Sequence, residues 1–128
     1  MSKNLLLADD QPQTRRVVRD VLAARDEWKI CGEAADGDEA VEKAKALHPD
    51  VAILDICMPR MNGIEAARQI IQIRGETAVL MISMYDPTLF LDELKRVGVR
   101  GFVSKSRMGS QLIPAIEALL EGRTYFEP

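Results

Sequence analysis

Apolar residues along this chain gather into five short runs, each followed by polar or turn-forming residues. Short runs of this kind, bounded by turn residues, are typical of strands that are buried on both faces of a sheet. The runs therefore predict strands at residues 5–8, 28–34, 51–56, 78–83 and 101–104.

The segments that follow these runs repeat apolar residues at the spacing of one helix face. Strand and helix alternate five times, and consecutive parallel strands need such crossovers. The pattern predicts an α/β fold, a flavodoxin-like, doubly wound, five-stranded parallel sheet of order 2-1-3-4-5 with five helices. Pro114 is expected in or near the first turn of the last helix, where proline is best tolerated. The five apolar stripes are Val17, Val18, Val21 and Leu22; Ala40, Val41, Ala44 and Leu47; Ile64, Ala67, Ile70 and Ile71; Leu91, Leu94 and Val97; and Leu112, Ala115, Ile116, Leu119 and Leu120.

Composition limits the class of protein. A length of 128 residues, with 47% hydrophobic and 29% charged residues, fits one globular domain. A net charge of -3 lacks the basic footprint of a nucleic-acid binder. Cys31 and Cys57 are not closely spaced and have no histidine beside them, so we expect free thiols rather than a disulfide or zinc site. Because no membrane-length apolar run or signal peptide is evident, we expect a cytoplasmic protein.

Polar side chains interrupt or follow four of the five predicted strands at their carboxyl ends. In an open α/β sheet this edge carries the ligand site, at the point where the strand order reverses. We therefore expect these groups to converge on one small volume. They are Asp9 and Asp10 after the first run, Asp55 near the end of the third, Ser83 at the end of the fourth and Lys105 after the fifth.

Three carboxylates held close together repel one another unless a cation lies among them. Mg²⁺ prefers such oxygen ligands, so Asp9 and Asp10 are candidate metal ligands and Asp55 a candidate nucleophile for phosphoryl transfer. Lys105 and Ser83 could then hold phosphoryl oxygens. Taken alone, Asp9 and Asp10 would be read as a solvated helix cap, but Asp55 interrupts an apolar strand where an ionised group needs a partner.

These residues stand in motifs that resemble one known family over essentially the whole chain. The motifs are "ADD" at 8–10, "ILDICMPRMNG" at 53–63, "MISMYD" at 81–86 and "FVSKS" at 102–106. Together they resemble the receiver domain of bacterial two-component response regulators. With the tail "EGRTYFEP", they look most like receivers attached to a LuxR-type helix-turn-helix output domain. The resemblance implies one receiver domain over residues 1–128, with the output domain absent from this chain.

Carried over residue by residue, the resemblance makes Asp55 the phosphoacceptor and Lys105 its phosphoryl partner. It implies a Mg²⁺ ion held directly by Asp10, largely through water by Asp9, and by Asp55 with the backbone carbonyl of Cys57. The implied phosphoryl donor is a phosphohistidine on a sensor histidine kinase. Such a domain is a signalling switch rather than an enzyme, since it catalyses only its own phosphorylation and dephosphorylation.

The switch itself is implied at Ser83 and Phe102, where the family carries a hydroxyl and an aromatic residue. Movement of Ser83 toward a phosphorylated Asp55 would let Phe102 rotate and rearrange the surface of the fourth helix, fifth strand and fifth helix. That surface would control a homodimer or the attached output domain, so DNA is contacted only through the missing domain and no membrane is involved.

Three features depart from the family pattern: the output domain is missing, Ser106 follows the lysine where proline is common, and Met84 is unusually long. Met84 and Tyr85 could slow water attack on the acyl phosphate, or simply pack in their loop. We predict a trans Lys105–Ser106 peptide, because cis before a residue other than proline costs roughly 2.5 to 4 kcal/mol.

Two other functions compete. An aspartyl phosphohydrolase of the haloacid dehalogenase type would resemble D-x-D-x-T after the first strand, where this chain has "DDQPQ". A receiver-like module that is never phosphorylated is disfavoured by the presence of both Asp55 and Lys105.

Overall fold

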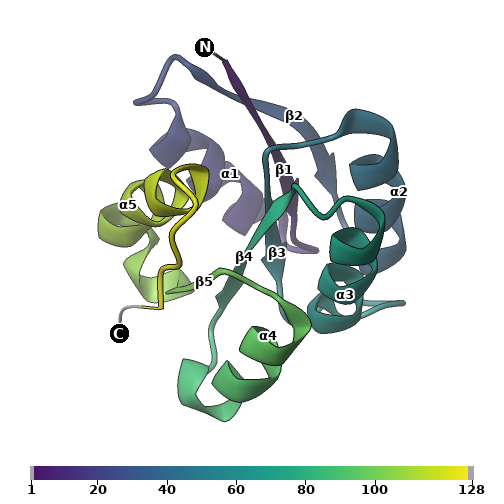
Figure 1. Ribbon diagram of the computed structural model, residues 1–128. Coiled ribbons are helices and arrows are strands. Elements are labelled where there is room, and N and C mark those ends of the chain that lie inside the picture. Colours follow the sequence, from purple (N-terminus) through teal and green to yellow (C-terminus); the bar gives the residue numbers. More distant parts are fainter. Residues whose placement is uncertain (1, 127–128) are drawn as a thin grey trace.

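A computed structural model describes residues 2–126 and contains one parallel sheet flanked by helices on both faces (Figure 1). The strand order is β2-β1-β3-β4-β5, which confirms the predicted topology. Only two strand bounds differ from the prediction, at the start of β1 and the end of β3. The strands are β1 (Lys3–Ala8), β2 (Trp28–Ala34), β3 (Val51–Asp55), β4 (Ala78–Ser83) and β5 (Gly101–Ser104).

Five α-helices follow the strands in turn, as the alternating pattern predicts. One buried cluster includes residues of α1 and α5, and the other includes residues of α2, α3 and α4, so the sheet separates two cores. Successive residues of β1 show this division, since Leu5 and Leu7 belong to one cluster and Leu6 and Ala8 to the other. The helices are α1 (Pro12–Leu22), α2 (Gly37–Leu47), α3 (Gly63–Ile73), α4 (Leu91–Val97) and α5 (Met108–Leu120).

N-cap side chains define where α2 and α3 begin, after the carboxyl ends of β2 and β3. Asp36 caps α2 by accepting a hydrogen bond from the backbone of Glu39 at 2.8 Å, and Asn62 caps α3 in the same way from Glu65 at 2.9 Å. A Cβ atom on Gly63 would lie 2.0 Å from the carbonyl oxygen of Asp55. Glycine at the start of α3 therefore lets that helix begin directly against the end of β3.

The apolar stripes were correct in position but not in every residue. Val17 is 44% exposed and Leu47 36% exposed, although both belong to predicted buried faces. Pro114 lies in the interior of α5 rather than near its first turn. The helix begins at Met108, four residues before the first residue of its predicted stripe, directly after a 3-10 turn at Lys105–Arg107.

Backbone and thiol predictions are also testable on the described residues. No peptide bond between residues 2 and 126 is cis, so the predicted trans Lys105–Ser106 bond is confirmed. Cys31 and Cys57 are both free. Within the described chain, no helix combines the length and apolar character that crossing a membrane requires.

Candidate functional site: an acidic pocket at the carboxyl end of the sheet

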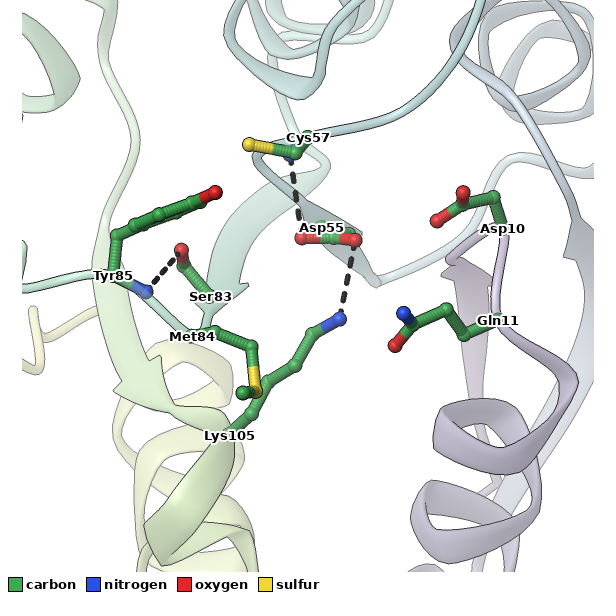
Figure 2. A pocket seen from close by; sticks show the side chains of 8 residues that line it. All are labelled: Asp10, Gln11, Asp55, Cys57, Ser83, Met84, Tyr85 and Lys105. Atoms are coloured by element: carbon green, nitrogen blue, oxygen red, sulfur yellow. Dashed lines mark hydrogen bonds and ion pairs between the residues drawn. The ribbon is translucent and has the colours of Figure 1, made fainter.

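Four of the five predicted strand-end residues, all except Asp9, line a cavity of about 500 Å³ at the carboxyl edge of the sheet (Figure 2). Residues after β1, at the ends of β3 and β4, and after β5 all contribute to it. The carboxyl ends of β1, β3, β4 and β5 lie together because these strands are parallel and adjacent in the sheet, and the strand order reverses between β1 and β3. The lining residues are Asp10, Gln11, Asp55, Cys57, Ser83, Met84, Tyr85 and Lys105.

Asp55 ends β3 at the floor of this pocket and is 5% exposed. Its Oδ2 accepts a hydrogen bond from Lys105 Nζ at 3.1 Å, and its Oδ1 accepts one from the backbone N–H of Cys57 at 3.3 Å. Burial raises the pKa of the Asp55 carboxyl, the charge of Asp9 raises it further, and Lys105 and the Cys57 amide offset only part of this effect. Ionisation of Asp55 therefore costs stability, and a buried acid whose pKa is raised in a cleft is typical of functional sites.

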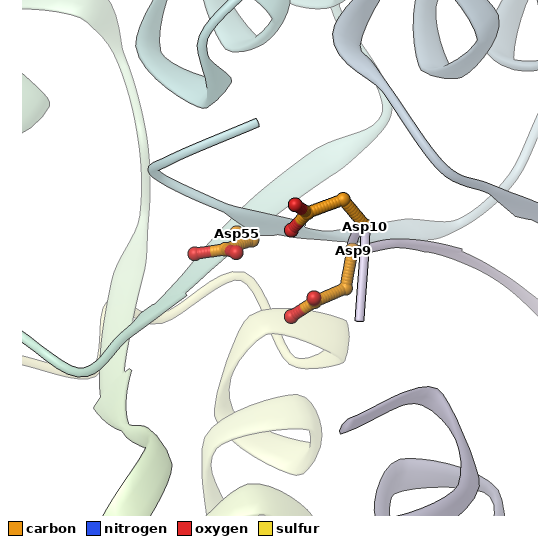
Figure 3. A group of neighbouring side chains, drawn as sticks. All are labelled: Asp9, Asp10 and Asp55. Carbon is orange, nitrogen blue, oxygen red and sulfur yellow. The ribbon is translucent and has the colours of Figure 1, made fainter. Parts of the chain in front are cut away.

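Asp9 and Asp10 complete a group of three aspartates that can each offer one carboxylate oxygen within 4.8 Å of the others (Figure 3). Asp9 is fully buried, whereas Asp10 is exposed at the pocket. Asp9 Oδ1 accepts a hydrogen bond from the backbone N–H of Gln11 at 2.8 Å. Asp9 Oδ2 lies 2.8 Å from Lys105 Nζ as an ion pair but has no hydrogen-bond partner among the described residues.

Lys105 is the single cation that lines this pocket among the described residues, and its side chain is 7% exposed. Burial alone would lower the pKa of its ammonium, but the contacts with Asp9 and Asp55 outweigh burial and raise it. Lys105 therefore remains charged and holds two buried carboxylates at once. One ammonium faces three carboxylates, so the site keeps an excess of negative charge.

Ser83 ends β4 and is 1% exposed, and its Oγ accepts a hydrogen bond from the backbone N–H of Tyr85 at 3.0 Å. This bond uses an acceptor lone pair and leaves the hydroxyl proton available to donate. Met84 and Tyr85 lie on the rim and are 75% and 56% exposed. They are thus close enough to the cavity to limit access to it.

Phe102 does not line the pocket. It lies on β5, is 2% exposed and belongs to the cluster that packs with α2, α3 and α4. Its partner on β4 is Met81, two residues before Ser83, so Ser83 and Phe102 lie on the same face of neighbouring strands. Phe102 therefore lies one strand away from Ser83, on the face that packs with α2, α3 and α4.

Sequence reasoning missed two contributors to the site. Gln11 lines the cavity, and its backbone N–H holds the carboxylate of Asp9. Arg15 donates to the backbone carbonyl of Asp9 at 2.5 Å, which ties α1 to the end of β1. The proline after Gln11, at the first position of α1, marks this turn and was the available signal.

The family model for the response regulator receiver domain matches residues 5–117. The chain belongs to this family. The general function of these domains in two-component systems is a phosphorylation switch that controls an output. Receiver domains generally bind Mg²⁺ at an acidic pocket, and this chain has a cluster of three aspartates, Asp9, Asp10 and Asp55.

Known relatives and structures agree with that membership. The receiver is 37% identical over 120 residues to the uncharacterized transcriptional regulatory protein YxjL of Bacillus subtilis, covering 94% of this chain and 55% of YxjL. It is 33% identical to the chemotaxis protein CheY of Thermotoga maritima, covering 91% of this chain and 96% of CheY. A LuxR-family two-component response regulator from Aurantimonas sp. SI85-9A1 has a TM-score of 0.94 at 33% identity, covering 100% of this chain and 91% of that structure.

The extent of these matches differs between classes of relative. The receiver spans 52% of the length of the transcriptional regulatory protein DegU of Brevibacillus brevis, 55% of YxjL and 58% of the oxygen regulatory protein NreC of Staphylococcus carnosus. Homologues of this receiver include LuxR-family response regulators. The membership predicted from the motifs and the fold predicted from the alternating pattern are confirmed, while the roles of individual site residues stay predictions.

Proposed function

We propose that this receiver accepts a phosphoryl group from a phosphohistidine of a sensor kinase onto Asp55. The single observation that carries the proposal is the position of Lys105 Nζ, 2.8 Å from Asp9 Oδ2 and 3.1 Å from Asp55 Oδ2, inside a cavity large enough for a phosphoryl group. A buried carboxylate with a raised pKa, a fixed ammonium and further acidic oxygens beside it are what aspartyl phosphorylation requires.

The transfer balances as a displacement at phosphorus. An oxygen of Asp55 attacks the phosphorus atom, a P–O bond forms, the P–N bond to the donor imidazole breaks, and the imidazole nitrogen takes up a proton. The transition state is loose, so positioning and charge neutralisation supply most of the catalysis. Lys105 is already placed against the nucleophile and would neutralise a phosphoryl oxygen, and the free proton of Ser83 Oγ would be donated to another.

The acidic residues fit a magnesium ion. Each of the three aspartates offers one hard carboxylate oxygen within 4.8 Å of the others, and the Lys105 ammonium, which pairs with Asp9 and Asp55, offsets only part of their charge. Asp10 and Asp55, with the backbone carbonyl of Cys57, would hold Mg²⁺ directly, and Asp9 largely through water. When bound, Mg²⁺ supplies positive charge to the transferring phosphoryl oxygens.

The output of this receiver is a change at the surface formed by α4, β5 and α5. Phosphorylated Asp55 presents new acceptor oxygens, and Ser83 would move toward them. Phe102, on the same face of the neighbouring strand, would then repack. That change would control a homodimer or an attached LuxR-type DNA-binding domain, so this net acidic receiver would act on DNA only indirectly.

We assign the receiver to residues 1–128, of which residue 1 and residues 127–128 lie outside the described part of the chain. Its chemistry is limited to its own phosphorylation and dephosphorylation. Met84 and Tyr85, on the rim of the cavity, are placed to modulate the approach of water to the acyl phosphate.

Intact-mass measurement after incubation with acetyl phosphate and Mg²⁺ tests the proposal. A single phosphoryl adduct that maps to Asp55 and disappears when Mg²⁺ is chelated before the incubation is the expected result. Steady turnover of a phosphate monoester would instead indicate a phosphohydrolase. Lack of any adduct, with the fold intact, would indicate a receiver-like module that is never phosphorylated.

A further inference from the structure

Gln11 is the N-cap residue of α1, but its side chain does not cap the helix. The amide makes no hydrogen bond to the backbone N–H groups of the first turn, and glutamine is not among the residues preferred at an N-cap. Only the backbone N–H of Gln11 serves the turn, by donating to Asp9 Oδ1 at 2.8 Å. The start of α1 therefore does not use this side chain, which lines the cavity that contains Asp55.

Thr14, three residues later in α1, holds the amide oxygen of Gln11. Thr14 is 8% exposed, and its Oγ1–H donates to Gln11 Oε1 at 3.2 Å. A buried hydroxyl proton needs an acceptor, and this amide oxygen is the one acceptor that it has within residues 2–126. The reverse orientation of the amide would leave that proton unpaired. Thr14 therefore fixes which end of the Gln11 amide remains free.

The free end of the amide is a hydrogen-bond donor. Figure 2 shows the Gln11 side chain extending from the start of α1 toward the interior of the pocket. Its Nε2 carries two N–H groups, and neither has an acceptor in the described part of the chain. The pocket therefore presents donor groups from two sides, the ammonium of Lys105 after β5 and the amide of Gln11 before α1.

We propose that the Gln11 amide is a further phosphoryl-binding group, whose Nε2–H donates to an oxygen of the phosphoryl group on Asp55, and that Thr14 is its positioning residue. The inference rests on the proposed function and adds to it a contact from α1. A transferring phosphoryl group spreads its charge over three oxygens, which together accept several hydrogen bonds. Lys105 and Ser83 would hold it from β5 and β4, and Gln11 would hold it from the opposite side.

A neutral donor has a particular advantage in this pocket. Lys105 attracts a phosphoryl group but also competes with Mg²⁺ for the three carboxylates, because both are cations. The Gln11 amide carries no net charge, so it can stabilise the phosphoryl oxygens without opposing the metal. Loss of the amide should therefore weaken binding of the phosphoryl group and leave the affinity for Mg²⁺ unchanged.

NMR titration with beryllofluoride, a phosphoryl analogue, at saturating Mg²⁺ tests the contact. Gln11→Met keeps a long side chain without the amide, and its affinity for beryllofluoride should fall by about 10-fold or more, as for a lost hydrogen bond to a charged group. Its affinity for Mg²⁺ alone should equal that of the wild type. Gln13→Met changes an exposed residue of the same helix that does not line the pocket, and it should bind both ligands like the wild type.

The same spectra report on the amide directly. The side-chain N–H signals of Gln11 are identified by their absence from the spectrum of Gln11→Met. In the wild type these signals should shift and exchange more slowly with solvent when beryllofluoride binds. Signals that do not change on binding would contradict a direct contact.

A double-mutant cycle tests the positioning role of Thr14. Thr14→Val removes the hydroxyl and should lower the affinity for beryllofluoride by about 5-fold, as for one neutral hydrogen bond. Thr14→Ser keeps the hydroxyl and should bind like the wild type. In the Gln11→Met background, Thr14→Val should have no further effect, because the amide that it positions is absent. An equal loss in both backgrounds would show that Thr14 acts on the fold rather than on Gln11.

The outcomes separate this inference from the proposed function. If an adduct forms at Asp55 but Gln11→Met and the wild type bind beryllofluoride equally, the inference is overturned alone. An equal fall in the affinities for Mg²⁺ and beryllofluoride in Gln11→Met would assign the amide to the metal site and would also overturn it. If the wild type forms no adduct with acetyl phosphate and does not bind beryllofluoride, the proposed function fails and this inference fails with it.

Discussion

The amino and carboxyl ends of the sheet each carry a cluster of charged side chains, and the two clusters differ in charge balance and in burial. At the amino end, Arg25 lies between two acids, with Nε 3.5 Å from Glu27 and Nη1 2.5 Å from Glu117, and its guanidinium stacks 4.5 Å above the ring of Trp28. At the carboxyl end, one lysine faces three aspartates, two of them buried.

The two clusters differ in charge balance: the charges at the amino end neutralise one another at the surface, whereas those at the carboxyl end leave buried carboxylates in excess. The amino-end cluster is solvated and its cation has partners on α5 and before β2, so nothing further is needed to satisfy it. In the carboxyl-end cluster one lysine offsets the charge of three carboxylates only in part, and the pKa of Asp55 is raised. A fold tolerates such a site only because the remainder of the sheet is well packed, and the site gains stability when a cation or phosphoryl group completes it.

The largest effect is expected from Asp55→Ala, which removes the acceptor at the carboxyl end. Phosphorylation by acetyl phosphate should be abolished, and the fold should be little affected because carboxylate repulsion is relieved at the same time. Intact mass and circular dichroism measure the two effects. Asp20→Ala, on the exposed face of α1, is the control and should be phosphorylated like the wild type. An adduct of equal strength on another residue of the Asp55→Ala variant would refute the assignment.

Lys105→Ala should slow phosphorylation on the order of 100-fold, because a fixed charge beside the transferring group is lost. Mg²⁺ affinity should be unchanged or slightly tighter, since a competing cation leaves the acidic cluster. Trp28 lies at the amino end of the sheet and cannot report on the metal, so calorimetry is the suitable measurement. Lys29→Ala on β2 is the control, and a large fall in Mg²⁺ affinity for Lys105→Ala alone would contradict this role.

Ser83→Ala should still be phosphorylated, but its structural change on phosphorylation should be weak. The reason is that the hydroxyl that would move toward the phosphoryl group is lost. Hydrogen exchange over residues 83–116, with and without beryllofluoride, measures the response. The wild type should change protection over this range and the variant much less. Unchanged protection in the wild type, or a full response in the variant, would defeat the switch through Ser83 and Phe102.

Asp55→Asn should raise the melting temperature by a few degrees at pH 7 without Mg²⁺. Burial and Asp9 raise the pKa of Asp55, so the folded state binds this proton more tightly than the unfolded state, and ionisation costs stability as the pH rises above about 4. The difference in melting temperature between the variant and the wild type should grow as the pH rises through the raised pKa of Asp55, and it should persist at pH 7. Added Mg²⁺ should reduce this difference. A difference in melting temperature that is largest at acid pH would contradict this account.

The smallest effect is expected at the amino end. Arg25→Gln breaks exposed ion pairs with Glu27 and Glu117, and such pairs contribute little to stability. We expect a slight fall in melting temperature and wild-type phosphorylation by acetyl phosphate. A marked loss of phosphorylation would show that the two ends of the sheet are coupled and that the amino-end cluster is not purely structural.

Local pattern determined most of the fold. Continuous apolar runs and helical stripes were sufficient for the strand order, because parallel strands with right-handed crossovers leave few arrangements. Asp55 was identifiable because an acid inside an apolar strand is costly, and Asp9, Asp10, Ser83 and Lys105 because each follows or ends a strand at the same edge. These five residues were thus predictable from the sequence, whereas Gln11 and Arg15 were not.

Tertiary structure alone decided how these groups contact one another. Nothing local in the sequence says that Lys105 lies closer to Asp9 than to Asp55, or that Asp9 is fully buried while its neighbour Asp10 is exposed. The interior position of Pro114 likewise depends on where α5 begins against the sheet. Each of these facts depends on contacts between segments far apart in the chain, whereas periodicity reports only which face of its own element a residue occupies.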